Sequence, residues 1–253
     1  MHRFHLSPAD CRGDELTLSG REAHHALHVL RLQPGERVVV FDGAGHEYLC
    51  ETLEATRQAL PLRVRERRAP ALRPTAITLV QAIPKGKMFD AIVQKATELG
   101  AARIVPVVTE RVISRLDAHQ AEHKADHWRD VAVEAAKQCG NPWLPRIEPP
   151  VGFPEFLSRR EVFDLSLLAS LQPGARHPRD CFRAFQNQHG QMPASVAVWV
   201  GPEGDFTAQE IASVQAAGAQ PIQLGPLVLR VETAAVYCLS IVNYEVQSPQ
   251  PDS

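Results

Sequence analysis

The pattern of hydrophobic and polar positions changes near residue 70. Before it, short stretches such as Arg37–Phe41 and Glu47–Leu53 have the composition and alternation typical of strands with one buried face. The intervening residues 42–45 (Asp-Gly-Ala-Gly) favour a hairpin turn, and Leu62–Arg65 alternates as a further strand. Residues 1–72 are therefore predicted to form a small, mainly β domain.

One helix is predicted inside this domain. Ser19 and Glu22 have the spacing of a capping box, in which the serine side chain accepts from the Glu22 amide and the glutamate reaches back. An apolar stripe with helical spacing follows and ends before Pro34. It consists of Ala23, Ala26, Leu27 and Leu30.

After a proline-containing link at residues 69–74, apolar strands alternate with amphipathic helices. The predicted strands lie at 77–80, 104–108, 163–171, 196–200 and 221–224. The predicted helices lie at 87–99, 128–139, 207–217 and 232–246, the third opening on a capping box of Thr207 and Glu210. Such a pattern predicts an α/β domain over 73–247, with a parallel sheet covered on both faces and ligands bound beyond the carboxyl ends of its strands. Residues 248–253 are expected to be a tail.

Composition adds few constraints. The 253 residues are 44% hydrophobic and 22% charged, with a formal net charge of −2, which is ordinary for a globular protein. The five scattered cysteines have no metal-like spacing and predict buried thiols in a reducing, cytoplasmic compartment. The N-terminus is too polar for a signal peptide, and no apolar run approaches the roughly 20 residues of a membrane span.

The distribution of charge is more informative. Residues 57–73 contain six arginines and one acid. This local excess is typical of a nucleic-acid-binding surface, but equally of a strand edge that charge protects from aggregation. The sequence leaves both interpretations open.

The stretch Val198–Thr207 (VWVGPEGDFT) ends a strand in a sharp turn before a helix. Its glycines permit close backbone approach, and amides at a helix start bind anions. However, Glu203 and Asp205 would repel a phosphate by about 1 kcal/mol or more, and no Lys-Ser/Thr pair follows as in a P-loop. A neutral or cationic ligand with hydroxyl groups is therefore expected, and S-adenosylmethionine meets this requirement. The alternative is a capped turn whose acids interact with the helix dipole.

A second strand runs into a Gly-Pro turn at residues 223–235 (QLGPLVLRVETAA). Its leucines and valines, with free backbone amides, are suited to flank an adenine ring. Arg230 is a candidate for contact with an RNA phosphate or for stabilising negative charge on a reacting base. Alternatively, Arg230 and Glu232 only pair with neighbouring residues.

In this order, the two turns resemble those of the SPOUT methyltransferases. More narrowly, the chain resembles the RsmE family, bacterial enzymes that methylate N3 of a uridine in 16S ribosomal RNA. Segments 1–4, 20–35, 81–87, 94–100 and 134–140 extend the resemblance over almost the whole chain. Two departures concern the turns: the family usually has glycine at the position of Asp205, and commonly arginine and isoleucine within 226–228.

The resemblance implies a PUA-like, β-barrel RNA-binding domain (1–72) followed by an α/β domain with a C-terminal trefoil knot (73–247). It further implies a homodimer with the active site near the subunit interface, S-adenosylmethionine as the cofactor, and the 16S RNA of the small ribosomal subunit as the partner. Neither a metal nor a membrane is expected to take part. The implied cofactor-binding residues are Leu171, Val200, Gly201, Glu203, Gly204, Leu224, Gly225, Leu229 and Thr233.

For methyl transfer to uridine N3, a group must remove the N3 proton or stabilise the resulting anion. The candidates are Glu98 and Glu232 as proton acceptors and Arg230 as the electrostatic stabiliser, although each also has a plausible structural role. His24 and His28 are spaced as two metal ligands on a helix, but no third ligand follows. The candidate RNA contacts are Arg3, Arg31, Arg63, Arg65, Arg67, Arg68, Lys85 and Lys87.

Two other functions remain open from the sequence. One is an RNA-binding ribosome-assembly factor without turnover, and the other is a SPOUT methyltransferase that modifies ribose 2′-hydroxyls. The intact turns at 201–204 and 224–233 favour an enzyme over a pure RNA-binding protein, because a binding protein has no use for a cofactor loop.

Overall fold

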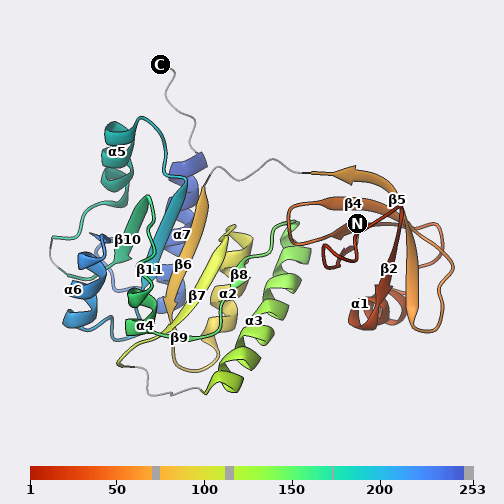
Figure 1. The fold of residues 1–253 in the computed structure, drawn as a ribbon, viewed down its shortest axis with the longest axis horizontal. Helices are drawn as coiled ribbons and strands as arrows, with labels where there is room; N and C mark the ends of the chain where they lie inside the picture. The colour runs from red at the N-terminus through yellow and green to blue at the C-terminus, as the bar shows by residue number, and fades with distance from the viewer. Residues whose placement is uncertain (70–74, 112–116, 173, 248–253) are drawn as a thin grey trace. The chain divides into compact units, whose positions relative to one another are not determined.

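The computed structural model describes residues 1–69, 75–111, 117–172 and 174–247, and the chain forms two compact units (Figure 1). The first unit comprises Met1–Leu72 and Val133–Leu144, and the second comprises Arg73–Ala132 and Pro145–Ser253. The link expected at 69–74 lies largely outside the described residues, as does the tail expected at 248–253.

The first unit is built on a sheet with the order β1-β3-β4-β5-β2. Its strands are β1 (Arg3–His5), β2 (Glu15–Ser19), β3 (Arg37–Phe41), β4 (Glu47–Thr52) and β5 (Ala59–Arg68). β1 pairs with β3 in parallel, and the other neighbours are antiparallel. Alternate side chains of these strands are buried in one core, which confirms the strands predicted from alternation at 37–41, 47–53 and 62–65.

The predicted helix of this unit is short and changes its winding. It consists of α1 (Gly20–His24) and a π-helical turn, η1 (His25–Val29), in which the Leu30 amide donates to the His25 carbonyl at 2.9 Å. The capping box predicted here is wrong. Ser19 is the residue before the helix, but its side chain makes no capping hydrogen bond. The Glu22 carboxylate, which would reach back to the Ser19 amide, instead accepts from Lys137 Nζ at 2.9 Å.

Residues Val133–Leu144 lie in the range assigned from sequence to the second domain, yet they pack within the first unit. They include the last turns of α3 (Ala118–Cys139). Beyond α3, the Gly45 amide donates to the Pro142 carbonyl at 3.1 Å, and the Leu144 amide donates to the Gly43 carbonyl at 2.9 Å. A methyl group on Gly45 would overlap the ring of Trp143, so only glycine fits this contact.

The second unit contains a sheet with the order β12-β10-β11-β6-β7-β8, and β9 also pairs with β7. Each of these pairs is parallel, as predicted. The strands are β6 (Ala76–Ala82), β7 (Arg103–Val108), β8 (Arg146–Ile147), β9 (Val151–Gly152), β10 (Leu165–Ala169), β11 (Ser195–Val200) and β12 (Gln220–Ile222).

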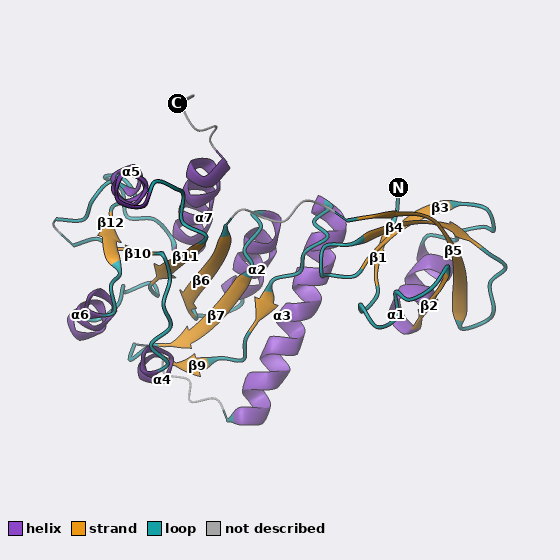
Figure 2. Ribbon diagram, turned by 45° about the horizontal axis from the view of Figure 1, so that its top comes forward, coloured by secondary structure: helices purple, strands orange, loops and turns teal. Residues whose placement is uncertain are grey.

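Helices cover both faces of this sheet (Figure 2). One face packs against α2 (Met88–Glu98), the first part of α3, α5 (Pro178–His189) and α7 (Val231–Gln247). The other packs against α4 (Phe153–Ser158) and α6 (Ala208–Ala216). Burial on both sides explains why the strands are apolar throughout rather than alternating. No helix in the described part of the chain is long and apolar enough to cross a membrane.

Four of the five cysteines lie in the protein interior and one lies at the surface. Cys11, Cys50, Cys181 and Cys238 are buried, and Cys139 is exposed. Burial raises the pKa of Cys11 to about 11 and the pKa of both Cys50 and Cys238 to about 12. These thiols therefore stay protonated and pack as small apolar groups.

Candidate active site

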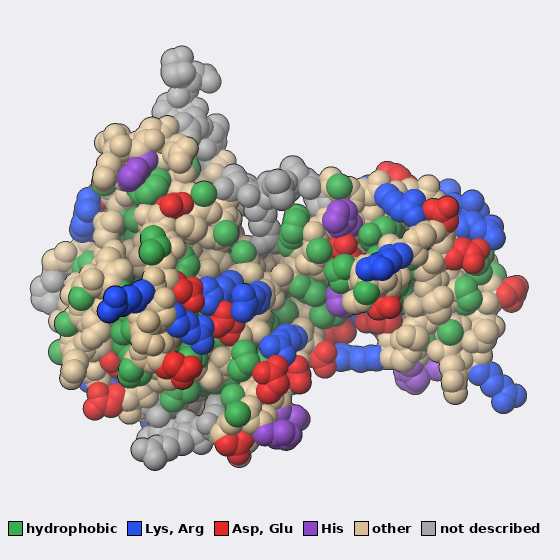
Figure 3. Space-filling model, in the orientation of Figure 1, with side chains coloured by type: hydrophobic (Ala, Val, Ile, Leu, Met, Phe, Trp, Pro, Cys, Tyr) green, Lys and Arg blue, Asp and Glu red, His purple; other side chains and the backbone are tan. Residues whose placement is uncertain are grey.

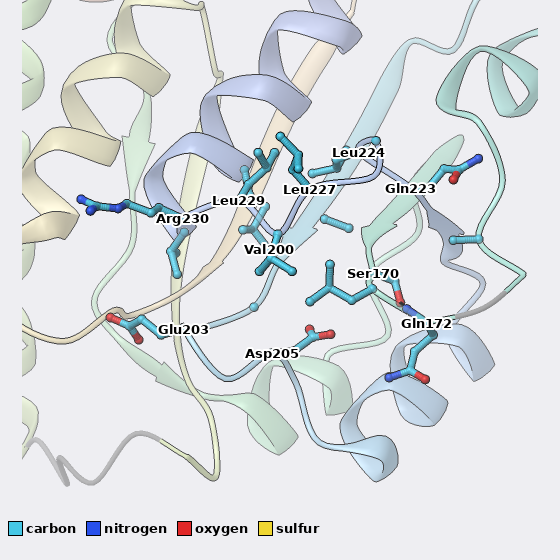
Figure 4. A pocket seen from close by; sticks show the side chains of 18 of the residues that line it. Ser170, Gln172, Val200, Glu203, Asp205, Gln223, Leu224, Leu227, Leu229 and Arg230 are labelled. Atoms are coloured by element: carbon cyan, nitrogen blue, oxygen red, sulfur yellow. Dashed lines mark hydrogen bonds between the residues drawn. The ribbon is translucent and has the colours of Figure 1, made fainter.

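A cavity of about 750 Å³ lies at the carboxyl ends of three neighbouring strands, β12, β10 and β11 (Figure 4). Its walls are the segments that follow these strands, within residues 169–175, 200–205 and 223–234. The chain therefore brings both Gly-Pro turns to one place, at the edge of a parallel sheet where ligands usually bind. The volume is in the range of cavities that hold cofactors.

The turn after β11 needs glycine at its first position. A methyl group on Gly201 would lie 3.0 Å from both the Phe206 amide nitrogen and Asp205 Oδ1, closer than such contacts normally come. Asp205 has a φ of +62°. Aspartate enters this left-handed region more readily than most residues. Its Oδ1 accepts from the Phe206 amide at 2.7 Å, which supports that conformation.

The glutamates near this turn bind neighbouring loops. Glu203 Oε1 accepts from the Lys85 amide at 2.9 Å, which joins the turn to the segment after β6. The buried Glu210 forms the predicted capping box with Thr207, and its Oε1 also accepts from the Glu110 amide at 3.0 Å. These two carboxylates thus satisfy backbone amides of loops that follow β6 and β7.

Two further residues, neither identified from sequence, hold the turn. Arg111, just after β7, donates through Nη1 to the carbonyls of Gly204 and Asp205, the latter at 3.3 Å. Gln81, fully buried at the end of β6, donates through Nε2 to the carbonyls of Ala82 at 2.9 Å and Val200 at 3.4 Å. A single amide at the end of an otherwise apolar strand was the signal for Gln81, whereas Arg111 stands in a loop without a motif.

The third wall combines apolar and charged side chains. Leu224 and Leu229 are half-buried, whereas Leu227 and Val228 are 73% and 78% exposed. Glu232 lies half-buried in the first turn of α7, next to the exposed Arg230. In Figure 4, Arg230 and Glu203 lie on the same side of the view, and Gln172 and Gln223 lie on the opposite side.

The cavity collects most of the predicted cofactor and catalytic residues. Those that line it are Leu171, Val200, Gly201, Glu203, Leu224, Gly225, Leu229, Arg230 and Glu232. Gly204, Thr233 and Glu98 are not among its lining residues; Glu98 accepts instead from Lys95 Nζ at 2.8 Å on α2. Ser170 and Asp205, which lie in the stretches expected to form the site, also line the cavity, and so do Gln172 and Gln223, which were not named from sequence.

The charges of the lining select against phosphates. Among the described lining residues, Glu203, Asp205 and Glu232 are acidic and Arg230 alone is basic. Carboxylates near a polyphosphate would cost energy, whereas they accept from hydroxyl groups and attract cations. With the apolar side chains of Val200, Leu224 and Leu229, the residues present fit a nucleoside with a cationic centre.

The predicted RNA contacts of the first unit are mostly paired. Arg3 is largely buried, where it binds Glu47 and lies over the ring of Phe41 at 5.6 Å. Three of the four β5 arginines bind carboxylates at 2.7–2.8 Å, in the pairs Arg65–Glu51, Arg67–Asp14 and Arg68–Glu66. The face seen in Figure 3 accordingly shows basic and acidic side chains interleaved.

The hydrogen bond from Arg68 lowers the pKa of the Glu66 carboxyl, which therefore stays ionised at neutral pH. Arg31, Arg63, Lys85 and Lys87 are exposed, and both lysines lie outside the cavity lining.

The rings of His24 and His28 are 4.9 Å apart, and no group of three or more His, Cys, Asp or Glu residues suited to a metal ion occurs within the described residues.

Comparison with known proteins identifies both parts of the chain. Residues 71–243 match an RNA methyltransferase domain, and residues 18–64 match an RNA methyltransferase PUA domain. The chain is 31% identical over 250 residues to ribosomal RNA small subunit methyltransferase E of Synechocystis, covering 98% of this chain and 78% of that protein.

Two solved structures are similar over nearly their full length. A Legionella pneumophila protein solved with the bound cofactor S-adenosylmethionine is 31% identical, with a TM-score of 0.83 and coverage of 95% of this chain and 96% of that chain. Ribosomal RNA small subunit methyltransferase E of Neisseria gonorrhoeae, bound to S-adenosylmethionine, is 27% identical, with a TM-score of 0.82 and 96% coverage of each chain. The chain therefore belongs to the RNA methyltransferase family that includes ribosomal RNA small subunit methyltransferase E.

Proposed function

We propose that the protein uses S-adenosylmethionine to methylate N3 of a uridine in the 16S RNA of the small ribosomal subunit. The observation that carries the proposal is the acid-lined cavity where both Gly-Pro turns meet, in a chain of this family. Two of its structural relatives hold S-adenosylmethionine. The proposed substrate is supported by a relative named as a ribosomal RNA small subunit methyltransferase and by the resemblance to uridine-N3 enzymes.

When bound, the cofactor supplies an electrophilic methyl group. The residues of this chain then have two tasks, to orient the base and to manage the N3 proton. We assign proton removal to Glu232, which lines the cavity half-buried, rather than to Glu98, which is bound to Lys95 outside the lining. Arg230, two residues before Glu232 on the same wall, stabilises the negative charge that develops on the base.

We also propose that the protein is a homodimer with a trefoil knot. In support of a dimer, Leu171, Leu227 and Val228 at the cavity are more than 60% exposed, as is Tyr244 on α7. In support of the knot, α7 follows the edge strand β12 but packs on the central strands β6 and β11. Light scattering on the purified protein tests the dimer. A ribosomal RNA substrate also supports a cytoplasmic location for the reaction.

The test of the function uses small ribosomal subunits that lack the modification. They are incubated with the protein and labelled S-adenosylmethionine, and the label is mapped on 16S RNA by nucleoside mass spectrometry. We expect label on one uridine base at N3. Label on a ribose would instead identify a 2′-O-methyltransferase, and RNA binding without label would identify an assembly factor.

A further inference from the structure

Asp205, unlike the exposed Glu203, is a half-buried acid of the cavity whose carboxylate is held by its own turn. Glu203 is bound to the Lys85 amide. Asp205 uses Oδ1 for the adjacent Phe206 amide, and no partner for Oδ2 occurs among the described residues. One oxygen of a half-buried, cavity-lining carboxylate is therefore available to a ligand.

The backbone fixes where this carboxylate lies. The backbone of Asp205 lies in the left-handed region, at φ +62°. The Asp205 amide donates to the Pro202 carbonyl at 2.9 Å, and the Asp205 carbonyl accepts from Arg111 Nη1 at 3.3 Å. Figure 4 shows the carboxylate reaching into the cavity between the segments that carry Val200 and Ser170. The negative charge is thus positioned before any ligand arrives.

We propose that Asp205 is a cofactor-contacting residue through which the cavity distinguishes the methyl donor from the demethylated product. The proposal rests on the proposed function. S-adenosylmethionine and S-adenosylhomocysteine share the adenosine, the ammonium and the carboxylate groups. They differ by the methyl group and by the positive charge of the sulfonium, so a fixed anion in the cavity stabilises only the donor through that charge.

This discrimination has a consequence for turnover. Transfer of the methyl group removes the positive charge from sulfur, so the attraction to Asp205 is lost in the same step. The neutral thioether product then leaves more easily, and product inhibition is weaker than it would be with glycine at this position.

The test is calorimetric and needs no turnover. Binding of S-adenosylmethionine and S-adenosylhomocysteine is measured for the wild-type protein, Asp205→Asn and Asp205→Gly. Asparagine keeps the left-handed conformation and the acceptor for Phe206 but removes the charge. We expect Asp205→Asn to lower the preference for the donor about three- to tenfold, as for the loss of one charge interaction in a partly solvent-screened site.

A control and a third ligand separate charge from shape. Asp126→Asn removes the same charge from an exposed carboxylate on α3 that does not line the cavity, and it is expected to leave the preference unchanged. Sinefungin carries an amine in place of the methylated sulfonium and is expected to lose affinity for Asp205→Asn as the donor does.

Equal loss of affinity for donor and product in Asp205→Asn would overturn the proposal and leave Asp205 a residue that only shapes the turn. Absence of donor binding to the wild-type protein would overturn the proposed function itself, and this inference with it.

Discussion

The acidic turn after β11 and the basic strand β5 carry opposite charges. In both regions, most of the charged side chains bind partners within their own unit. Glu203 binds a backbone amide of a neighbouring loop, and Arg65 and Arg68 bind carboxylates of their own unit. The two regions differ in the charged atoms that keep no internal partner. The turn keeps the second oxygen of Asp205 at a cavity, whereas three of the four β5 arginines are exposed but paired.

This comparison shows that a run of like charge is a weak indicator of a ligand until its internal partners are known. The glycine at position 201 was the stronger indicator, because the backbone folds so closely on itself there that an added methyl would lie 3.0 Å from the Phe206 amide nitrogen. The following substitutions test the two regions separately.

The largest effect is expected from Arg230→Ala. If Arg230 stabilises charge on the reacting base, single-turnover methyl transfer falls about 100-fold or more, whereas calorimetric affinity for S-adenosylmethionine changes by less than about threefold. A loss of affinity as large as the loss of rate would show that Arg230 shapes the cofactor cavity instead.

Gly201→Ala is expected to have the next largest effect. The added methyl would lie 3.0 Å from the Phe206 amide nitrogen, so the turn must open and affinity for S-adenosylmethionine falls by about tenfold or more. The matched control is Gly152→Ala, where φ is −61° and the methyl would lie 3.9 Å from Glu155. Equal affinities of the two variants would contradict a tightly packed cofactor turn.

Arg111→Met removes the guanidinium that binds the carbonyls of Gly204 and Asp205. Loss of these charge-assisted hydrogen bonds is expected to weaken S-adenosylmethionine binding about three- to tenfold by loosening the turn. Arg179→Met is the control, since Arg179 is exposed and binds Glu245 on α7. If the two variants bind the cofactor equally well, Arg111 does not position the turn.

The smallest effect is expected on β5. Replacing Arg65, Arg67 and Arg68 by glutamine is expected to weaken binding of a 16S RNA fragment a few-fold. The slope of log affinity against log salt concentration should become shallower by about one to two. Both effects are small because the carboxylate partners of these arginines already compete with RNA phosphates. Filter binding between 50 and 200 mM salt measures both quantities. Replacing the partners Glu51, Asp14 and Glu66 by their amides is expected to strengthen binding. No change in either set would leave β5 a charged strand edge.

Much of the fold followed from local pattern. Strands such as Ala76–Ala82 and Ser195–Val200 are apolar because helices cover both faces of the sheet, and the turns at 201 and 225 mark where strands end at the cavity. The packing of Val133–Leu144 in the first unit was not predictable in this way, because it depends on residues far apart in sequence.

The same limit applies to the site. Motif spacing pointed to Arg230 and Glu232, which do line the cavity, but it could not show that Glu98 is bound to Lys95 outside the lining. Likewise, Ser19 has the right neighbours for a capping box, but Glu22 binds Lys137, more than 100 residues away. Long-range partners of this kind decide the role of a charged side chain, and local sequence does not contain them.

The return of Val133–Leu144 to the first unit bears on how this protein is dissected into fragments. A truncation that stops at residue 72 deletes the Lys137 ammonium and leaves Glu22 without its cation. It also removes Trp143, which packs on Gly45, and the two hydrogen bonds that Gly43 and Gly45 form with Leu144 and Pro142. A stable excised N-terminal unit is therefore expected to need residues 133–144 joined to the N-terminal fragment by a linker.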